Sequence, residues 1–317
     1  MIKRYFLQIL IVLLMLTIAW ILVSLKEIKP SLSEALNKPI QASINQSAGD
    51  KTAVNPQFFP MRNWLIDEPE ISAQSGIIIN FKTENEKNNS LYQKNSNQVL
   101  LIASLSKIMT AIVVLGNYDP EEVIKVSDKS VTMTGDTGGL IRDEDLKVKD
   151  LLYIMLMESS NDAAMALAGD NPRLSYNEFI SLMNNKAKEL GLKNTVFIDP
   201  MGLDSGNKST VTEIAELTEY ALKFPLILEI FKTQNTTVSS IDNKFIHNLT
   251  STNKLLGRIP QIIGGKTGFT EEAGGCMMTI LRISENNYLI TVVLDSDERE
   301  NDVEKLINWV QQAYIWQ

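Results

Sequence analysis

Two side chains that could perform nucleophilic chemistry stand three residues apart in a long apolar run. The run LIASLSKIMTAIVVLG, residues 101–116, contains Ser104 and Lys107. Residues three apart share a helix face, so the hydroxyl and the amine can meet there. Apolar surroundings lower the pKa of a lysine, and a neutral amine can accept the proton of a serine hydroxyl. The pair predicts a serine nucleophile at the start of a helix, with a lysine base one turn later.

Other groups that could perform hydrolysis are scarce in the chain. His247 is the sole histidine, Cys276 is the sole cysteine, and no Gly-x-Ser-x-Gly motif occurs. These facts disfavour a Ser-His-Asp hydrolase and a zinc site, and we expect neither a metal nor another cofactor. We expect His247 to be structural or on the surface, and Cys276 to be a small side chain packed on a strand.

The Ser-x-x-Lys spacing alone is a weak signal, because residues 205–208 and 251–254 match it too. A surface lysine that extends its amine to water is the alternative interpretation. Two further motifs favour the catalytic one. Ser-Ser-Asn at 159–161 lies between the apolar helical stretches DLLYIMLM and NDAAMALA, and GGKTGFT places Lys-Thr-Gly, residues 266–268, at the start of a strand. The order and the wide spacing of the three motifs carry the specificity.

With the segments IASLSKIMTA, NTVFIDPMGLD and GGKTGFTEEAGG, these motifs resemble those of serine D-alanyl-D-alanine carboxypeptidases. These are low-molecular-weight penicillin-binding proteins of the penicillin-recognising serine hydrolase family, whose relatives carry a related motif set. The resemblance covers about residues 66–317. It implies an α/β (α+β) fold, in which an antiparallel sheet is flanked by helices and joined by a helical subdomain.

The resemblance also implies an activity outside the cell. The enzyme would trim the terminal D-alanine from peptidoglycan stem peptides ending in D-Ala-D-Ala, through an acyl-enzyme on Ser104. β-Lactams would be covalent inhibitors. The alternatives are a DD-endopeptidase that cuts peptide cross-links, and a penicillin-acylated binding or sensor module with little turnover.

The same resemblance assigns the catalytic roles by position. It implies that Ser104 is the nucleophile, that Lys107 is its base, and that Ser159 relays a proton to the departing amine. Asn161 would bind the substrate amide and help to hold Lys107.

Substrate-binding roles follow from the third motif in the same way. Lys266 and Thr267 would bind the terminal carboxylate of the substrate, since a fixed cation and a hydroxyl select a free C-terminus. Gly268 would let the substrate backbone approach the strand closely. The backbone N–H groups of Ser104 and Phe269 would form the oxyanion hole.

Two positions depart from the family pattern. Ser106 stands where a threonine is expected, and Ser160 replaces the usual glycine, which adds a side chain to the middle loop of the site. We expect these changes to affect substrate fit and rate more than reaction type. No Glu-x-x-Asn occurs between Asn161 and Lys266, so efficient β-lactamase activity is not expected.

The N-terminal region predicts attachment to a membrane. Residues 6–25 form an almost wholly apolar run that would span about 30 Å as a helix, the thickness of a bilayer's hydrocarbon core. Lys3 and Arg4 precede it, which favours a cytoplasmic N-terminus and an extracytoplasmic remainder. An uncleaved anchor is favoured over an export signal cut after Ala35.

Three regions follow from these patterns: a membrane anchor or signal segment over 1–25, a flexible linker over 26–65, and a catalytic domain over 66–317. The linker is rich in Ser, Asn, Gln and Lys and has no sustained periodicity. The formal net charge of -8 and the pI near 5.0 argue against a nucleic-acid partner.

The elements that must position the site can be read from periodicity. SGIIINF, LYQKN and QVLLIA predict paired strands near the start of the domain, and CMMTILRI and YLITVVL predict strands near its end. The middle of the chain reads as mostly helical. Ser175 with Glu178, and Thr210 with Glu213, have the spacing of capping boxes that open helices. A final helix is predicted within DVEKLINWVQQAY.

Overall fold

The computed structural model describes residues 60–81, 89–283 and 288–316. The predicted membrane span at 6–25 and most of the predicted linker lie outside these residues. In the described ranges, no helix has the length and apolar character needed to cross a bilayer. Strand β1 (Met61–Arg62) pairs with β13 (Tyr314–Ile315), so the fold already includes residues that the sequence assigned to the linker.

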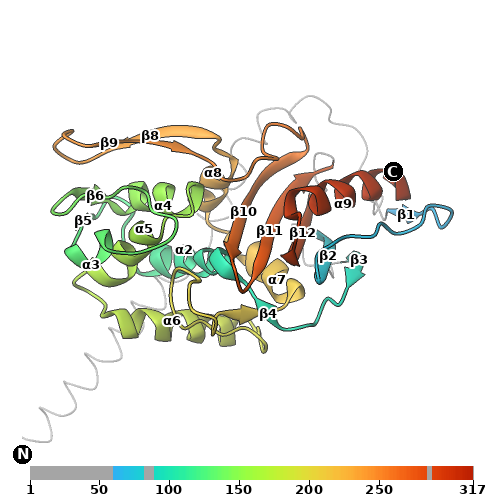
Figure 1. Cartoon of the computed structure of the whole chain (residues 1–317), viewed down its shortest axis with the longest axis horizontal. Helices are drawn as coiled ribbons and strands as arrows, with labels where there is room; N and C mark the ends of the chain where they lie inside the picture. Colours follow the sequence, from blue (N-terminus) through green and yellow to red (C-terminus); the bar gives the residue numbers. More distant parts are fainter. Residues whose placement is uncertain (1–59, 82–88, 284–287, 317) are drawn as a thin grey trace, which may run out of the picture. The chain divides into compact units, whose positions relative to one another are not determined.

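An antiparallel five-stranded sheet forms the centre of the described fold. Its strands are β2 (Ser75–Phe81), β3 (Asn89–Lys94), β10 (Ile262–Thr270), β11 (Gly274–Arg282) and β12 (Tyr288–Ser296), in the order β10-β11-β12-β2-β3. Strand β2 is buried along its whole length because helices cover both faces of the sheet. Ile77 and Ile79 belong to the larger core on the side of α7 (Val211–Ala221), whereas Ile78 packs in the core under α9 (Arg299–Ala313) (Figure 1).

A group of helices lies beside the β10 edge of the sheet (Figure 1). Its centre is α2 (Ser106–Asn117), which is buried from Ser106 to Val114. The remaining elements are α3 (Asp128–Val131), α4 (Val148–Met157), α5 (Asn161–Met165), α6 (Tyr176–Glu189), α8 (Pro225–Lys232), and the short strand pairs β4 (Leu100–Leu101) with β7 (Lys208–Ser209), β5 (Val123–Lys125) with β6 (Asp145–Lys147), and β8 (Asn235–Ser239) with β9 (Ile246–Thr250). The predicted fold class, a helix-flanked antiparallel sheet with a helical subdomain, is confirmed.

Two local predictions need correction. The segment QVLLIA does not add a strand to the main sheet, because only Leu100–Leu101 are extended and they pair with β7 instead. The Lys-Thr-Gly motif lies in the second half of β10 rather than at the start of a strand.

The two predicted capping boxes have different outcomes. Ser175 and Glu178 form a complete box at the start of α6. Thr210 accepts the backbone N–H of Glu213 at the start of α7, but the Glu213 carboxylate accepts from the backbone N–H of Asn194 at 2.9 Å instead of returning to the cap. Glu213 therefore fastens a neighbouring loop to the helix.

Candidate active site

Ser104 is presented by a tight turn in front of α2. It lies in a 3₁₀ turn, η2 (Ala103–Leu105), so the α-helix itself begins two residues after it and not at Ser104 as predicted. Two glycines press on this turn: a Cβ atom at Gly202 would lie 1.9 Å from the Ala103 carbonyl oxygen, and one at Gly268 would lie 2.9 Å from the Ser104 nitrogen. The predicted nucleophile is thus held between a loop and strand β10.

Lys107 is fully buried and hydrogen-bonded to uncharged acceptors. Its Nζ lies 2.9 Å from Ser104 Oγ, 2.8 Å from Asn161 Oδ1 and 2.8 Å from the Met201 carbonyl oxygen. Burial lowers the pKa of Lys107 to about 7, against an opposing effect from nearby carboxylates, which are those of Asp199, Asp136 and Asp162. At neutral pH the amine is therefore present both protonated and neutral, as a base for Ser104 requires.

The second motif joins α4 to α5 and reaches the same amine. Ser159 is buried and has a positive φ of 62°, which few side chains adopt without support from their surroundings. Asn161 donates its backbone N–H to the Asp136 carbonyl oxygen at 2.7 Å and its Nδ2 to the Thr134 carbonyl oxygen at 2.8 Å. Both contacts orient Asn161 Oδ1 toward Lys107.

The two departures from the family pattern are accommodated away from the cleft. Ser160 is fully buried, caps α5 by accepting the Ala163 N–H, and donates to the Asp162 carboxylate. Ser106 donates to the Ala103 carbonyl oxygen at 2.9 Å and accepts from Asn207 Nδ2. Ser160 does add a side chain to the middle loop, as expected, and its hydroxyl braces the backbone inside the fold.

The third motif brings a second buried amine. Lys266 Nζ lies 2.8 Å from Ser159 Oγ and 2.6 Å from the Thr267 carbonyl oxygen. Burial lowers the pKa of Lys266 well below its ordinary value, and the positive charges of Lys107 and Arg299 act in the same direction. The sequence analysis expected Lys266 to be a fixed cation, whereas its surroundings in the structure disfavour the charged form.

The remaining predicted residues lie on the same strand. Thr267 Oγ1 is 2.6 Å from Thr252 Oγ1, and Gly268 packs against the Ser104 backbone. Phe269 is 57% exposed, so its side chain borders the site rather than filling it. All eight predicted site residues are therefore gathered around one region, where η2, the 159–161 turn and β10 meet.

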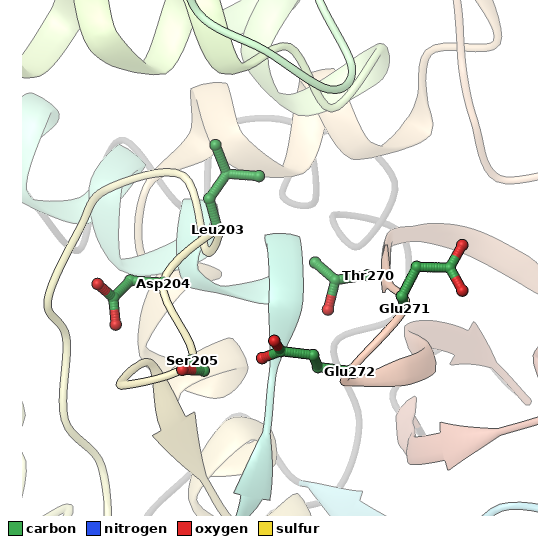
Figure 2. Close-up of a pocket in the computed structure, with 6 residues that line it drawn as sticks. All are labelled: Leu203, Asp204, Ser205, Thr270, Glu271 and Glu272. Atoms are coloured by element: carbon green, nitrogen blue, oxygen red, sulfur yellow. The ribbon is translucent and has the colours of Figure 1, made fainter.

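A surface pocket of about 360 Å³ adjoins this region (Figure 2). It is formed by the loop after Gly202 and by the turn that connects β10 to β11. Glu272 reaches across the opening toward Ser205 in the close-up view. The residues lining it are Leu203, Asp204, Ser205, Thr270, Glu271 and Glu272.

Four residues of this region were not predicted. The Met201 carbonyl accepts from Lys107, Thr252 contacts Thr267, and Arg299 Nη1 donates to the Gly268 carbonyl oxygen at 2.6 Å. Asp199 holds the loop that carries Met201 by accepting the N–H groups of Met201 and Gly202. The DPMGLD run, which is part of the family resemblance, was the available signal for the loop, but nothing in the sequence pointed to Thr252 or Arg299.

His247 and Cys276 both lie in the packed interior. His247 Nε2 lies 2.7 Å from Glu144 Oε1, and its Nδ1 lies 3.3 Å from the Gly138 carbonyl oxygen. Cys276 is fully buried on β11, and burial raises the pKa of its thiol to about 12. These environments are those of structural side chains, as the sequence predicted.

A buried serine in hydrogen-bond contact with a buried lysine, beside a helix-flanked antiparallel sheet, is the geometry that a serine hydrolase with a lysine base requires. Residues 63–298 match the D-alanyl-D-alanine carboxypeptidase family, peptidase family S11, and the chain belongs to this family. The predicted family and the serine peptidase class are thereby confirmed.

The relatives are named for different activities. The chain is 33% identical over 254 residues to a D-alanyl-D-alanine endopeptidase of Escherichia coli, covering 78% of this chain and 80% of that protein. It is 33% identical over 252 residues to the D-alanyl-D-alanine carboxypeptidase DacF of Bacillus subtilis, covering 76% of this chain and 63% of that protein. The crystal structure of the Streptomyces K15 DD-transpeptidase superimposes with a TM-score of 0.71 at 28% identity, over 78% of this chain and all of that one.

Proposed function

We propose that the chain is a serine D-Ala-D-Ala carboxypeptidase acting on peptidoglycan stem peptides. Ser104 Oγ attacks the carbonyl carbon of the penultimate D-alanine while Lys107 Nζ accepts the hydroxyl proton. The peptide C–N bond breaks, the terminal D-alanine leaves with a proton on its amine, and water then hydrolyses the acyl-enzyme. The observation that carries this proposal is the 2.9 Å contact between Ser104 Oγ and an amine whose pKa burial lowers to about 7.

The other side chains support the reaction around this pair. Ser159 passes the proton to the departing amine, and Asn161 keeps Lys107 in place while it contacts the substrate amide. Lys266 and Thr267 receive the terminal carboxylate, which would favour the protonated form of Lys266. The backbone N–H groups of Ser104 and Phe269 stabilise the oxyanion, and Gly268 leaves room for the substrate backbone.

DD-endopeptidase action on cross-links is the second candidate. Relatives from Escherichia coli and Pseudomonas aeruginosa, 33% and 30% identical, are named as D-alanyl-D-alanine endopeptidases. The same acyl-enzyme would form whenever the leaving amine belongs to a second stem peptide. β-Lactams would acylate Ser104 in either case.

The N-terminal sequence supports a proposal for the location of the reaction. We propose that residues 6–25 anchor the chain in the cell membrane, and that the domain over 66–317 works outside the cytoplasm at the end of the linker. The apolar run and the preceding Lys3 and Arg4 support this arrangement.

Product analysis separates the candidates. The full chain in detergent is incubated with a peptide ending in D-Ala-D-Ala and with a cross-linked peptide dimer. Free D-alanine from the first substrate supports the carboxypeptidase, and cleavage of the dimer supports the endopeptidase. A stable penicillin adduct without either product would instead indicate the sensor module.

The same preparation tests the nucleophile. Penicillin should add its mass to the wild type and to Ser205→Ala, a matched control in which the changed serine also precedes a lysine by three residues. Ser104→Ala should show no adduct. An undiminished adduct in Ser104→Ala would contradict the assignment.

A further inference from the structure

An exposed apolar turn follows β1 at one end of the described fold (Figure 1). Trp64 and Leu65 are 81% and 93% exposed, more than any other large hydrophobic side chain in the described ranges. Met61 and Ile315, opposite each other in the β1–β13 pair, are 50% and 55% exposed. We call these four side chains the apolar turn. Exposing adjacent large apolar side chains to water is unfavourable in free energy, so the apolar turn indicates a surface that contacts a partner.

The apolar turn is held rigidly by the domain. The Asn63 N–H donates to the Ala313 carbonyl oxygen at 2.7 Å, and Arg62 Nη2 donates to the Ile66 carbonyl oxygen at 2.8 Å. The Arg62 guanidinium also lies over three rings, 5.4 Å from Trp64, 4.5 Å from Trp309 and 5.4 Å from Tyr314. A braced turn can present its side chains to a surface without being ordered first.

The chain itself indicates which surface this is. The turn lies a few residues after Pro60, where the described domain begins, and the proposed membrane anchor ends at residue 25. Residues 26–59 would have an end-to-end distance of about 30 Å as a random coil, so the bilayer lies within reach of the turn. Tryptophan favours the membrane–water interface, where its ring is among lipids and its N–H remains hydrated.

We propose that the apolar turn inserts into the interfacial layer of the membrane and thereby orients the catalytic domain on it. The proposal rests on the membrane anchor put forward above. Asp67, Glu68 and Glu70 are exposed beside the turn, so attraction to anionic lipids does not drive the contact. Burial of apolar surface drives the contact, so we expect insertion into membranes of zwitterionic lipids as well.

A fluorescent probe can report this insertion in the full chain. Cys276 is fully buried, so an environment-sensitive maleimide should react only with an introduced cysteine. Asp67→Cys places the probe beside the apolar turn and leaves that turn intact. Ile246→Cys is the matched control, because Ile246 is 63% exposed on β9 in a different part of the fold.

The labelled proteins are reconstituted into phosphatidylcholine vesicles containing brominated lipid, and vesicle flotation is measured alongside. Insertion predicts that both proteins float, that emission of the probe at 67 falls roughly twofold or more, and that emission of the probe at 246 does not change. The double change Trp64→Ser/Leu65→Ser should abolish the quenching at 67. It should leave penicillin acylation in detergent unchanged, because neither side chain is among the residues of the candidate site.

Each other result overturns the proposal and identifies the reason. Failure to float overturns both the anchor and the insertion. Flotation without quenching at 67 overturns the insertion alone. Quenching that survives the double change means that the anchor merely holds the domain near the lipid. Concentration-dependent shielding of the probe at 67 without vesicles means that a second copy of the chain covers the turn.

Discussion

The pH dependence of acylation tests the role of Lys107 most directly. Burial lowers its pKa from 10.5 to about 7, which raises the neutral fraction at pH 7 about a thousandfold. The acylation rate constant for a fluorescent penicillin should therefore follow a titration with its midpoint near pH 7. It should fall roughly fivefold from pH 7 to pH 6, then roughly tenfold from pH 6 to pH 5, and level off above pH 8.

Two variants locate the titrating group. Lys107→Arg keeps a positive charge but cannot lose its proton, so the rate should fall by about a thousandfold and the acid limb should disappear. Asp136→Asn removes an exposed carboxylate that raises the pKa of Lys107, so the acid limb should move to lower pH. Asp67→Asn, another exposed aspartate, is the control and should leave the limb in place.

Stopped-flow fluorescence over pH 5–9 measures these rates, with melting temperatures recorded at each pH to exclude unfolding. A flat profile in the wild type would refute the argument that a buried neutral amine is the base. A limb that persists in Lys107→Arg would assign the titration to another group.

Two further predictions concern the carboxylate-binding side and the stability of the domain. Converting the substrate's terminal carboxylate to an amide should reduce kcat/KM in the wild type by about 30-fold, corresponding to roughly 2 kcal/mol for a charged hydrogen bond. The same conversion should reduce kcat/KM by much less in Lys266→Ala. Similar losses in both proteins would show that Lys266 does not bind the carboxylate. Asp302→Ala should destabilise the domain by at least about 2–3 kcal/mol in urea unfolding at pH 7, because the buried carboxylate accepts four hydrogen bonds, from Ser72, Ala73 and Ser296, whose donors would lose their partner. Burial raises the pKa of Asp302, but these hydrogen bonds outweigh burial and lower the pKa overall. The carboxylate therefore stabilises the fold above its unfolded pKa, and this stabilisation is lost as the pH falls through its folded pKa. A free-energy loss in Asp302→Ala that is the same at pH 3 as at pH 7 would contradict this.

The chemistry-bearing positions could be predicted because they depend on residue type and local spacing. Residues three apart come together in any helical turn, so the contact between Ser104 and Lys107 followed from their spacing even though Ser104 lies in the 3₁₀ turn before α2. The strands β2, β11 and β12 followed from their apolar runs in the same way.

The environment of those positions could not be predicted, because it is assembled from distant segments. The acceptor at Met201 is a backbone carbonyl placed by Asp199, and the lowered pKa of Lys266 depends on burial beside Lys107 and Arg299. The spacing of residues in the sequence does not show which way a backbone carbonyl points or how deeply a side chain is buried. The β8–β9 hairpin was not predicted for a related reason: burial alternates along β9, but its apolar residues Ile246 and Leu249 stand three apart, so the sequence itself shows no strand periodicity.

Gly202 and Gly268, on either side of the serine turn, limit which substitutions the site can tolerate. A Cβ atom at Gly202 or Gly268 would collide with the backbone of the serine turn, so we expect a substitution at either position to displace Ser104. Leu203 and Phe269, their immediate neighbours, are 40% and 57% exposed and carry no such constraint. Libraries aimed at new peptide preferences should therefore randomise Leu203 and Phe269 and keep both glycines.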